Sequence, residues 1–248
     1  MKTIKMLKWF LLPLTVAMFT ACVGGSGEEE PTTITHNGTT YGFVTSPYTG
    51  KVWLDRNLGA ARVCEQFDDS ACYGDYYQWG RNFDGHEDSL SASLDASAAS
   101  QAADVSNVGH GKFIESNSTY EYDWARMADP LGNDRIANWS ATDGSSVCPV
   151  GFRVPTIIEL QAELLNAGSA EIKNRDDAFA SFLKLPSNGL RDRSSADLVG
   201  QGSSGHIWST TPNGLGSTSK QIYFTSNNAA SSSVASRAYG FSVRCLRD

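Results

Sequence analysis

The chain has 248 residues, of which 40% are hydrophobic, 19% are charged and 10% are aromatic, and its formal net charge is −7. A chain of this length can bury a sizeable core, and its aromatic content argues against extended disorder. The mature chain would be still more negative, at −10, because an N-terminal leader that contains Lys2, Lys5 and Lys8 would be removed. Nucleic acids and anionic lipids attract basic stripes. We therefore expect no nucleic-acid partner.

The first residues have the order of a secretory signal peptide. Three lysines precede the apolar stretch 9–19, which is too short to span a bilayer, and small residues then precede Cys22. The segment FTAC (19–22) resembles the bacterial lipobox, whose cysteine becomes diacylated, although Phe19 replaces the usual leucine. We expect a signal peptide at 1–21 and a lipid anchor on Cys22. The alternative is an ordinary secretory signal with a chance cysteine.

Residues 22–39 are expected to form the lipidated cysteine and a flexible acidic tether. The stretch 23–33 is rich in Gly, Ser and Glu, and such a segment cannot bury a core. Its three glutamates (28–30) also resemble the acidic export tag of surface lipoproteins in Bacteroidetes. This resemblance implies an outer-membrane lipoprotein on the cell surface. A plain linker, with the domain facing the periplasm, is the alternative.

Four cysteines remain once Cys22 is assigned to lipid, and an even number in an exported chain indicates disulfides. Of the three pairings, we favour Cys64–Cys72, which lie close together in an acidic stretch, and Cys148–Cys245, which joins the middle of the chain to its end. Zinc is the weaker alternative, because the chain lacks C-x-x-C and its four histidines lack ligand spacing. We expect no metal and no cofactor.

The first half of the chain predicts few regular elements. Short strands are expected at 40–44 and 51–54, because alternating residues there flank a turn. The aromatic spacing of YGDYYQW (73–79) favours a short helix. Residues 86–120 are expected to form an irregular insertion, because much of this stretch is Ser and Ala without apolar periodicity.

The second half contains the strongest helix signal. Thr156 and Glu159 form a capping box that predicts a helix with a C-terminal end near Gly168. A second helix is expected at 176–183, and short strands at 206–209, 221–225 and 240–245. Two helices among short antiparallel strands indicate an α+β fold.

Five segments follow the order of a known pattern. They are VWLDRNLGA (52–60), CYGDYYQWGR (72–81), CPVGFRVPTIIEL (148–160), IWSTT (207–211) and GFSVRC (240–245). Together they resemble the Fibrobacter succinogenes major paralogous domain over about residues 41–248. The resemblance implies a single exported bacterial domain at 40–248, related in fold to C-type lectins and formylglycine-generating enzymes, and implies no particular activity. Because C-type-lectin-like folds join their helical part to the last strand, it also fits the Cys148–Cys245 bridge.

Catalytic chemistry finds little support in the residues. The chain has neither G-x-S-x-G nor H-E-x-x-H. A redox role for Cys64 and Cys72 is disfavoured because acids surround the pair, whereas a thiolate nucleophile needs a cationic neighbour. The calcium-lectin tripeptides are missing, and calcium near Asp129, Asn133 and Asp134 is a weaker alternative to a plain turn. We expect a protein that is not an enzyme.

Tryptophans beside amide-rich loops are the remaining binding candidates. Trp208 in IWSTT and Trp139 in an expected loop are assigned to ligand stacking, with core packing as the alternative for each. The sequence thus predicts a lipid-anchored surface protein whose domain contacts glycans or proteins outside the cell. A structural envelope-interaction domain without a small ligand, or an enzyme related to formylglycine-generating enzymes, are the alternatives.

Overall fold

The computed structural model describes residues 31–164 and 171–248. Residues Thr32–Asp248 form one compact unit. The expected signal peptide, Cys22 and Gly168 lie outside the described residues. Within the described ranges, no helix combines the length and apolar character needed to cross a bilayer.

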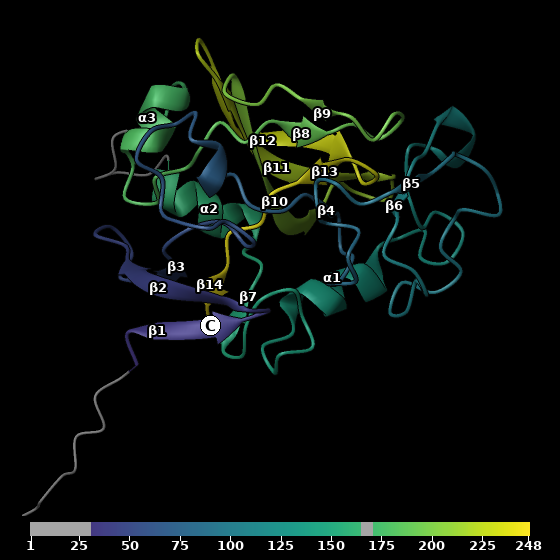
Figure 1. Ribbon diagram of the computed structural model, residues 1–248, viewed down its shortest axis with the longest axis horizontal. Coiled ribbons are helices and arrows are strands. Elements are labelled where there is room, and N and C mark those ends of the chain that lie inside the picture. Colours follow the sequence, from purple (N-terminus) through teal and green to yellow (C-terminus); the bar gives the residue numbers. More distant parts are fainter. Residues whose placement is uncertain (1–30, 165–170) are drawn as a thin grey trace, which may run out of the picture. The chain divides into compact units, whose positions relative to one another are not determined.

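A five-stranded sheet brings the N-terminal and C-terminal strands together. Its order is β1-β2-β3-β14-β7, with every pair antiparallel. The last strand therefore lies between strands from the beginning and the middle of the chain (Figure 1). The strands are β1 (Thr33–His36), β2 (Thr39–Thr45), β3 (Val52–Leu54), β7 (Phe152–Arg153) and β14 (Leu246–Arg247).

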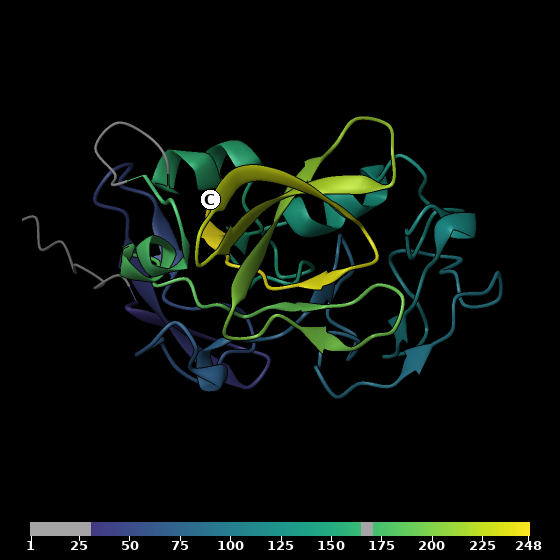
Figure 2. The same cartoon turned by 90° about the horizontal axis from the view of Figure 1, so that it is seen from above.

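Three further sheets complete the strand architecture. Two antiparallel hairpins form the sheet β10-β11-β12, and short strands form the antiparallel sheet β4-β13-β8-β9. A parallel pair, β5 and β6, lies with its loops at the opposite end of the unit from α3 (Figures 1 and 2). The strands are β4 (Tyr77–Gln78), β5 (Ser93–Leu94), β6 (Phe113–Ile114), β8 (Leu190–Arg191), β9 (Leu198–Val199), β10 (Ser204–Pro212), β11 (Thr218–Thr225), β12 (Ala229–Ser236) and β13 (Gly240–Phe241).

Helices are few and short, which confirms a mixed α+β fold. The described α-helices are α1 (Asn133–Ser140), α2 (Ile157–Leu164) and α3 (Arg175–Ala180), and short 3₁₀ turns occupy Ser70–Cys72 and Ser118–Tyr120. The capping box that begins α2 is confirmed. The Glu159 amide donates to Thr156 Oγ1 at 3.3 Å, and the Thr156 amide donates to Glu159 Oε2 at 2.9 Å. Leu160 and Leu164 bury the inner face of α2.

Both favoured disulfides are confirmed. Cys64 and Cys72 are bonded, with Cα atoms 5.2 Å apart, and Cys148 and Cys245 are bonded, with Cα atoms 5.9 Å apart. All four cysteines are buried. The second bridge links the segment before β7 to the residue that precedes β14.

The helix expected at 73–79 is wrong. Gly74 has a φ of +78°, and a Cβ there would lie 2.2 Å from the Leu58 carbonyl oxygen, so the chain turns where the helix would begin. Tyr77 then pairs with Phe241 as part of β4. The aromatic spacing reflects burial on several sides rather than one helical face. The strand expected at 240–245 is also wrong in its extent: only residues 240–241 form a strand, β13, and β14 begins after the expected strand, at Leu246.

The expected boundary between tether and domain at residue 40 is also wrong. Residues 33–36 form β1 and pair with β2 through a turn at Asn37 and Gly38, both of which have positive φ. Ile34 packs on the main hydrophobic core. The folded unit therefore includes residues 32–39, which the sequence predicts as part of the tether.

Candidate functional site

The two tryptophans expected to bind a ligand are core residues. Trp208 and Trp139 are both 0% exposed, so neither ring offers a face to a ligand. The Trp208 indole N–H donates to the Tyr77 carbonyl at 2.9 Å, and its ring lies 4.3 Å from that of Phe241. A buried indole needs such a partner for its N–H. The assignment of these residues to ligand stacking is therefore corrected.

Trp139 instead supports a groove on the surface. It belongs to helix α1 rather than to a loop, and its indole N–H donates to the Arg81 carbonyl at 3.1 Å. Asn138, on the same helix, donates to the Val105 carbonyl at 3.3 Å. Helix α1 thus holds both Arg81 and Val105, and each of these residues begins one wall of the groove.

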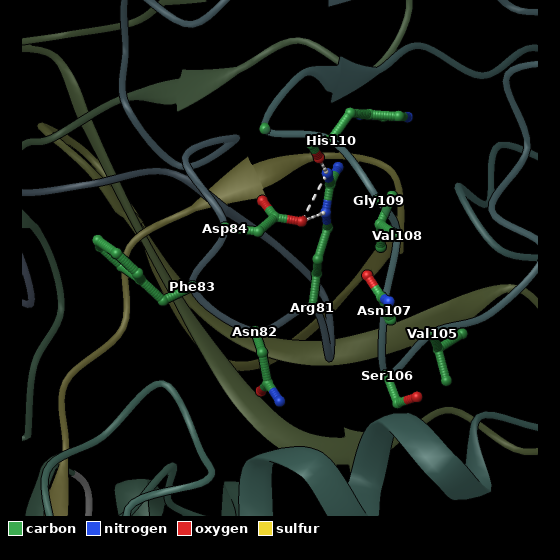
Figure 3. A pocket seen from close by; sticks show the side chains of 11 residues that line it. Arg81, Asn82, Phe83, Asp84, Val105, Ser106, Asn107, Val108, Gly109 and His110 are labelled. Carbon is green, nitrogen blue, oxygen red and sulfur yellow. Dashed lines mark hydrogen bonds and ion pairs between the residues drawn. The ribbon is translucent and has the colours of Figure 1, made fainter.

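The groove lies between two segments that are distant in sequence. One wall is 81–84 and the other is 105–111, within the expected insertion 86–120. Its volume is about 480 Å³, which falls in the range typical of small-molecule sites. Figure 3 shows Arg81 in the middle, with Asp84 on one side and Asn107, Val108 and Gly109 on the other.

Arg81 joins the two walls. Its guanidinium donates to Asp84 Oδ2 at 2.9 Å on its own segment. Across the groove it donates to the carbonyls of His110 at 2.8 Å and Lys112 at 2.9 Å. Hydrogen bonds from a buried cation to fixed acceptors are strong. Both walls are therefore fixed before any ligand arrives.

Two glycines let the walls approach at their base. Gly85 has a φ of +103°, and a Cβ on Gly111 would lie 2.5 Å from the Asp84 carbonyl oxygen. Since real Cβ atoms do not come that close to a backbone atom, any larger residue at 111 would push the walls apart. Glycine at this position thus sets the width of the groove.

A possible metal cluster lies under the first wall. The ligand atoms of Asp84, His86 and Glu87 lie within 4.8 Å of one another. However, the backbone N–H of Gln78 donates to His86 Nε2 at 3.1 Å. Nε2 is therefore an acceptor, and the neutral ring carries its proton on Nδ1. Nδ1 then donates to Asp84 Oδ1 at 2.8 Å and lies 3.2 Å from Glu87 Oε2. The nitrogen that faces the carboxylates holds a proton, so this arrangement is a hydrogen-bond network rather than a metal cage.

The groove is polar with little net charge. Arg81 and Asp84 pair at 2.8 Å and neutralise each other. Burial lowers the pKa of His110, so this ring is uncharged at neutral pH. An ionic ligand would therefore find no uncompensated charge on the walls.

A neutral side-chain amide of the groove remains available for hydrogen bonds. It is not that of Asn82, which donates through Nδ2 to the Ser145 carbonyl at 3.1 Å and whose Oδ1 is buried. No described residue bonds to the side-chain amide of Asn107. Phe83 is 50% exposed at the same groove. Asn107 and Phe83 thus line one groove, each with an exposed side chain.

The other sites considered from the sequence are engaged elsewhere. The Asp129 carboxylate accepts from the amides of Gly132 at 2.9 Å and Arg135 at 3.1 Å, and from Arg135 Nε at 3.2 Å, so it caps and braces helix α1. Near the Cys64–Cys72 bridge, Arg62 pairs with Asp69 at 3.0 Å. Its charge is therefore taken up by that carboxylate.

The sequence alone does not identify Asn82, Phe83 or Asn107. The only signal for them is weak: an aromatic residue between Asn82 and Asp84, followed by Gly85. The opposite wall lies inside the expected insertion 86–120. Only the fold brings these two loops together.

Comparison with known proteins yields no match, whether with family models, curated proteins or solved structures.

Proposed function

We propose that this chain is an exported, lipid-anchored protein whose domain binds a neutral glycan in the groove between 81–84 and 105–111. The observation that carries the proposal is Phe83, a half-exposed aromatic ring at a groove with balanced charge. Sugar rings stack on aromatic faces, and their hydroxyls pair with amides. The exposed side-chain amide of Asn107 lines the groove and can both donate and accept such hydrogen bonds.

Export is supported by the leader and by the cysteines. Basic, apolar and small residues precede Cys22 in the order of a lipoprotein signal. Both remaining cysteine pairs are oxidised, and such disulfides persist outside the cytosol. We therefore place the domain beyond the cytoplasmic membrane, anchored through Cys22 and exposed at the cell surface.

We further propose that the fold is C-type-lectin-like and belongs with the Fibrobacter succinogenes major paralogous domains. The long Cys148–Cys245 bridge supports this assignment, because it joins the segment before α2 to the end of the chain. In the proposed mode, a ligand is held without calcium, since the walls offer amides and a ring rather than several carboxylates.

An array of neutral and charged oligosaccharides tests the proposal. The purified protein should bind neutral glycans equally well with and without EDTA. Phe83→Ala should weaken that binding about tenfold, which corresponds to ~1.4 kcal/mol and to the loss of one stacked ring. Tyr48→Ala is the matched control, because Tyr48 is 43% exposed and does not line the groove.

Two results would contradict the proposal. One is an array on which no neutral glycan binds, which would favour a structural role without a small ligand. The other is a Phe83→Ala variant that binds as tightly as the wild type while Tyr48→Ala does not. Binding abolished by EDTA would overturn the calcium-free mode.

A further inference from the structure

A second, smaller cavity lies on another side of Phe83. It has a volume of about 210 Å³ and is lined in part by residues of β1 and β2, by Gly59, and by Asp75 and Tyr77. This is below the size typical of whole drug-like ligands, so the cavity suits a single head group. Phe83 lines both this cavity and the groove.

Gly59 leaves the space that the carboxyl group of Asp75 occupies in this cavity. A Cβ on Gly59 would lie 2.1 Å from Asp75 Cγ, and Gly59 has a φ of +75°. The Asp75 amide is fixed by the Leu58 carbonyl at 2.9 Å. Only glycine at position 59 allows the carboxyl group to occupy this place.

Asp75 has no cationic partner among the described residues. Its side chain accepts one hydrogen bond, from the Tyr77 hydroxyl at 3.3 Å, and takes part in none of the described ion pairs. The charges that act on it most, those of Glu87 and Asp88, are also negative. Burial, together with Glu87, raises the pKa of Asp75 to about 7. A buried carboxylate without a counter-ion is costly and therefore favours a cation supplied from outside.

The other groups around the cavity are neutral and rich in acceptors. The Tyr41 hydroxyl accepts from the Gly59 amide at 2.9 Å. Burial raises the pKa of Tyr77 well above its ordinary value, so this phenol keeps its proton. His36 bonds through Nε2 to the Val147 carbonyl at 2.7 Å, and burial lowers its pKa, so it carries no charge at neutral pH.

We propose that this cavity binds the ammonium group of a cationic amine, with the Asp75 carboxylate as its counter-ion and the Phe83 ring beside it. The ammonium donates to Asp75 and to the Tyr41 oxygen, and the aromatic ring attracts its charge. Ca²⁺ or Mg²⁺ fits less well, because each takes six or more oxygen ligands and a single carboxylate lines the cavity. This site shares Phe83 with the proposed glycan groove, but its counter-ion Asp75 does not line the groove, so ammonium binding does not require a glycan.

Ligand-observed NMR with the purified full chain tests the site, with butylammonium as the probe and butanol as its neutral isostere. Butylammonium should bind at pH 8 and about tenfold more weakly at pH 6, because Asp75 takes up a proton through pH 7 while the amine stays charged. Butanol should not bind measurably at either pH. Glu87 carries a lowered pKa and is ionised throughout this interval.

Variants separate Asp75 from the other acids. Asp75→Asn should abolish butylammonium binding, whereas Glu65→Gln, which removes an exposed carboxylate from a different part of the surface, should leave it unchanged. Asp75→Asn removes an uncompensated buried charge, so its melting temperature at pH 8 should equal or exceed that of the wild type. Butanol binding as tightly as butylammonium, or wild-type affinity that does not change between pH 6 and pH 8, would overturn the proposal. These results are independent of whether any glycan binds the groove.

Discussion

The Arg244 guanidinium donates twice to the amide oxygen of Asn57, through Nε at 3.2 Å and through Nη2 at 3.0 Å. Both side chains are buried. The third nitrogen, Nη1, donates to the Leu183 carbonyl at 2.8 Å. Among the described residues, no carboxylate forms an ion pair with Arg244. The side-chain amide of Asn57 thus joins the segments 240–245 and 52–60, and it accepts two hydrogen bonds from the buried guanidinium.

Asn57→Ala should destabilise the domain by about 3 kcal/mol. Each hydrogen bond to a charged group contributes roughly 1.5–3 kcal/mol, and loss of the acceptor leaves part of a buried guanidinium unpaired. Urea unfolding should show the loss, with exposed Asn227→Ala as the control within about 0.5 kcal/mol of the wild type. Equal midpoints for the two variants would refute the role given to Asn57.

The long disulfide should stabilise the domain more than the short one. Cys148 and Cys245 are separated by 97 positions, and Cys64 and Cys72 by 8. In the loop-entropy model these bridges contribute about 4.7 and about 2.6 kcal/mol. Cys245→Ser should therefore lower the free energy of unfolding more than Cys72→Ser. The reverse order in denaturant melts would show that native-state strain, not loop length, decides.

His206 should make the domain sensitive to acid. Burial lowers its pKa to about 4, with the ring bonded to Gln221 Oε1 at 3.0 Å. The unfolded chain takes up a proton near pH 6.5, whereas the folded ring does not, so this stabilisation is full above pH 6.5 and falls as pH drops towards 4. The loss is roughly 3 kcal/mol over that interval.

His206→Asn isolates this contribution, because asparagine can keep a donor near Nδ1 but does not titrate. Unfolding at pH 7 and pH 4 should show a smaller difference in the variant, by roughly 3 kcal/mol. The same pH dependence in both proteins would mean that other groups account for it.

Cys22→Ser should release the protein from membranes. Two or more acyl chains give stable anchoring, whereas one is marginal. Fractionation of cells should find the wild type in the membrane and the variant in the soluble fraction, and mass spectrometry should detect acylation only in the wild type. A variant that still sediments with membranes, beside an unacylated wild type, would contradict the anchor.

Local signals in the sequence predicted local structure well. The capping box at Thr156 begins α2 because it satisfies backbone groups within four residues, without help from the rest of the fold. The Asn37-Gly38 pair is an equally local hairpin signal and indicates β1, but the polar composition around it favoured a tether. A strand of only four residues changes the local composition too little to be recognised from it.

The tryptophans could not be placed from their neighbours. Trp139 lies among Asn and Ser residues, a setting that is common for ligand-binding aromatic residues. In α1, however, its side chain faces inward, and its indole N–H donates to the Arg81 carbonyl. Polar residues on a short helix occupy its outer face, and they do not determine whether the residue between them is buried. Trp208 is buried because both faces of β10 are covered, so that consecutive residues 205–210 are all buried.

The groove depends on long-range contacts that no local pattern encodes. Arg81 reaches the carbonyls of His110 and Lys112 across about thirty residues of irregular chain. Every residue type has a backbone carbonyl that can accept a hydrogen bond, so the sequence does not indicate which residues Arg81 contacts. Gly111 is required by the close approach of the walls, but it is one of 23 glycines.

Amide chemical shifts show directly whether a glycan binds in the groove. The neutral glycan selected on the array would be titrated into isotope-labelled protein. We expect shifts that are concentrated at 81–84 and 105–111 in the wild type and weak in Phe83→Ala. Shifts concentrated elsewhere, and unchanged by Phe83→Ala, would contradict binding in the groove.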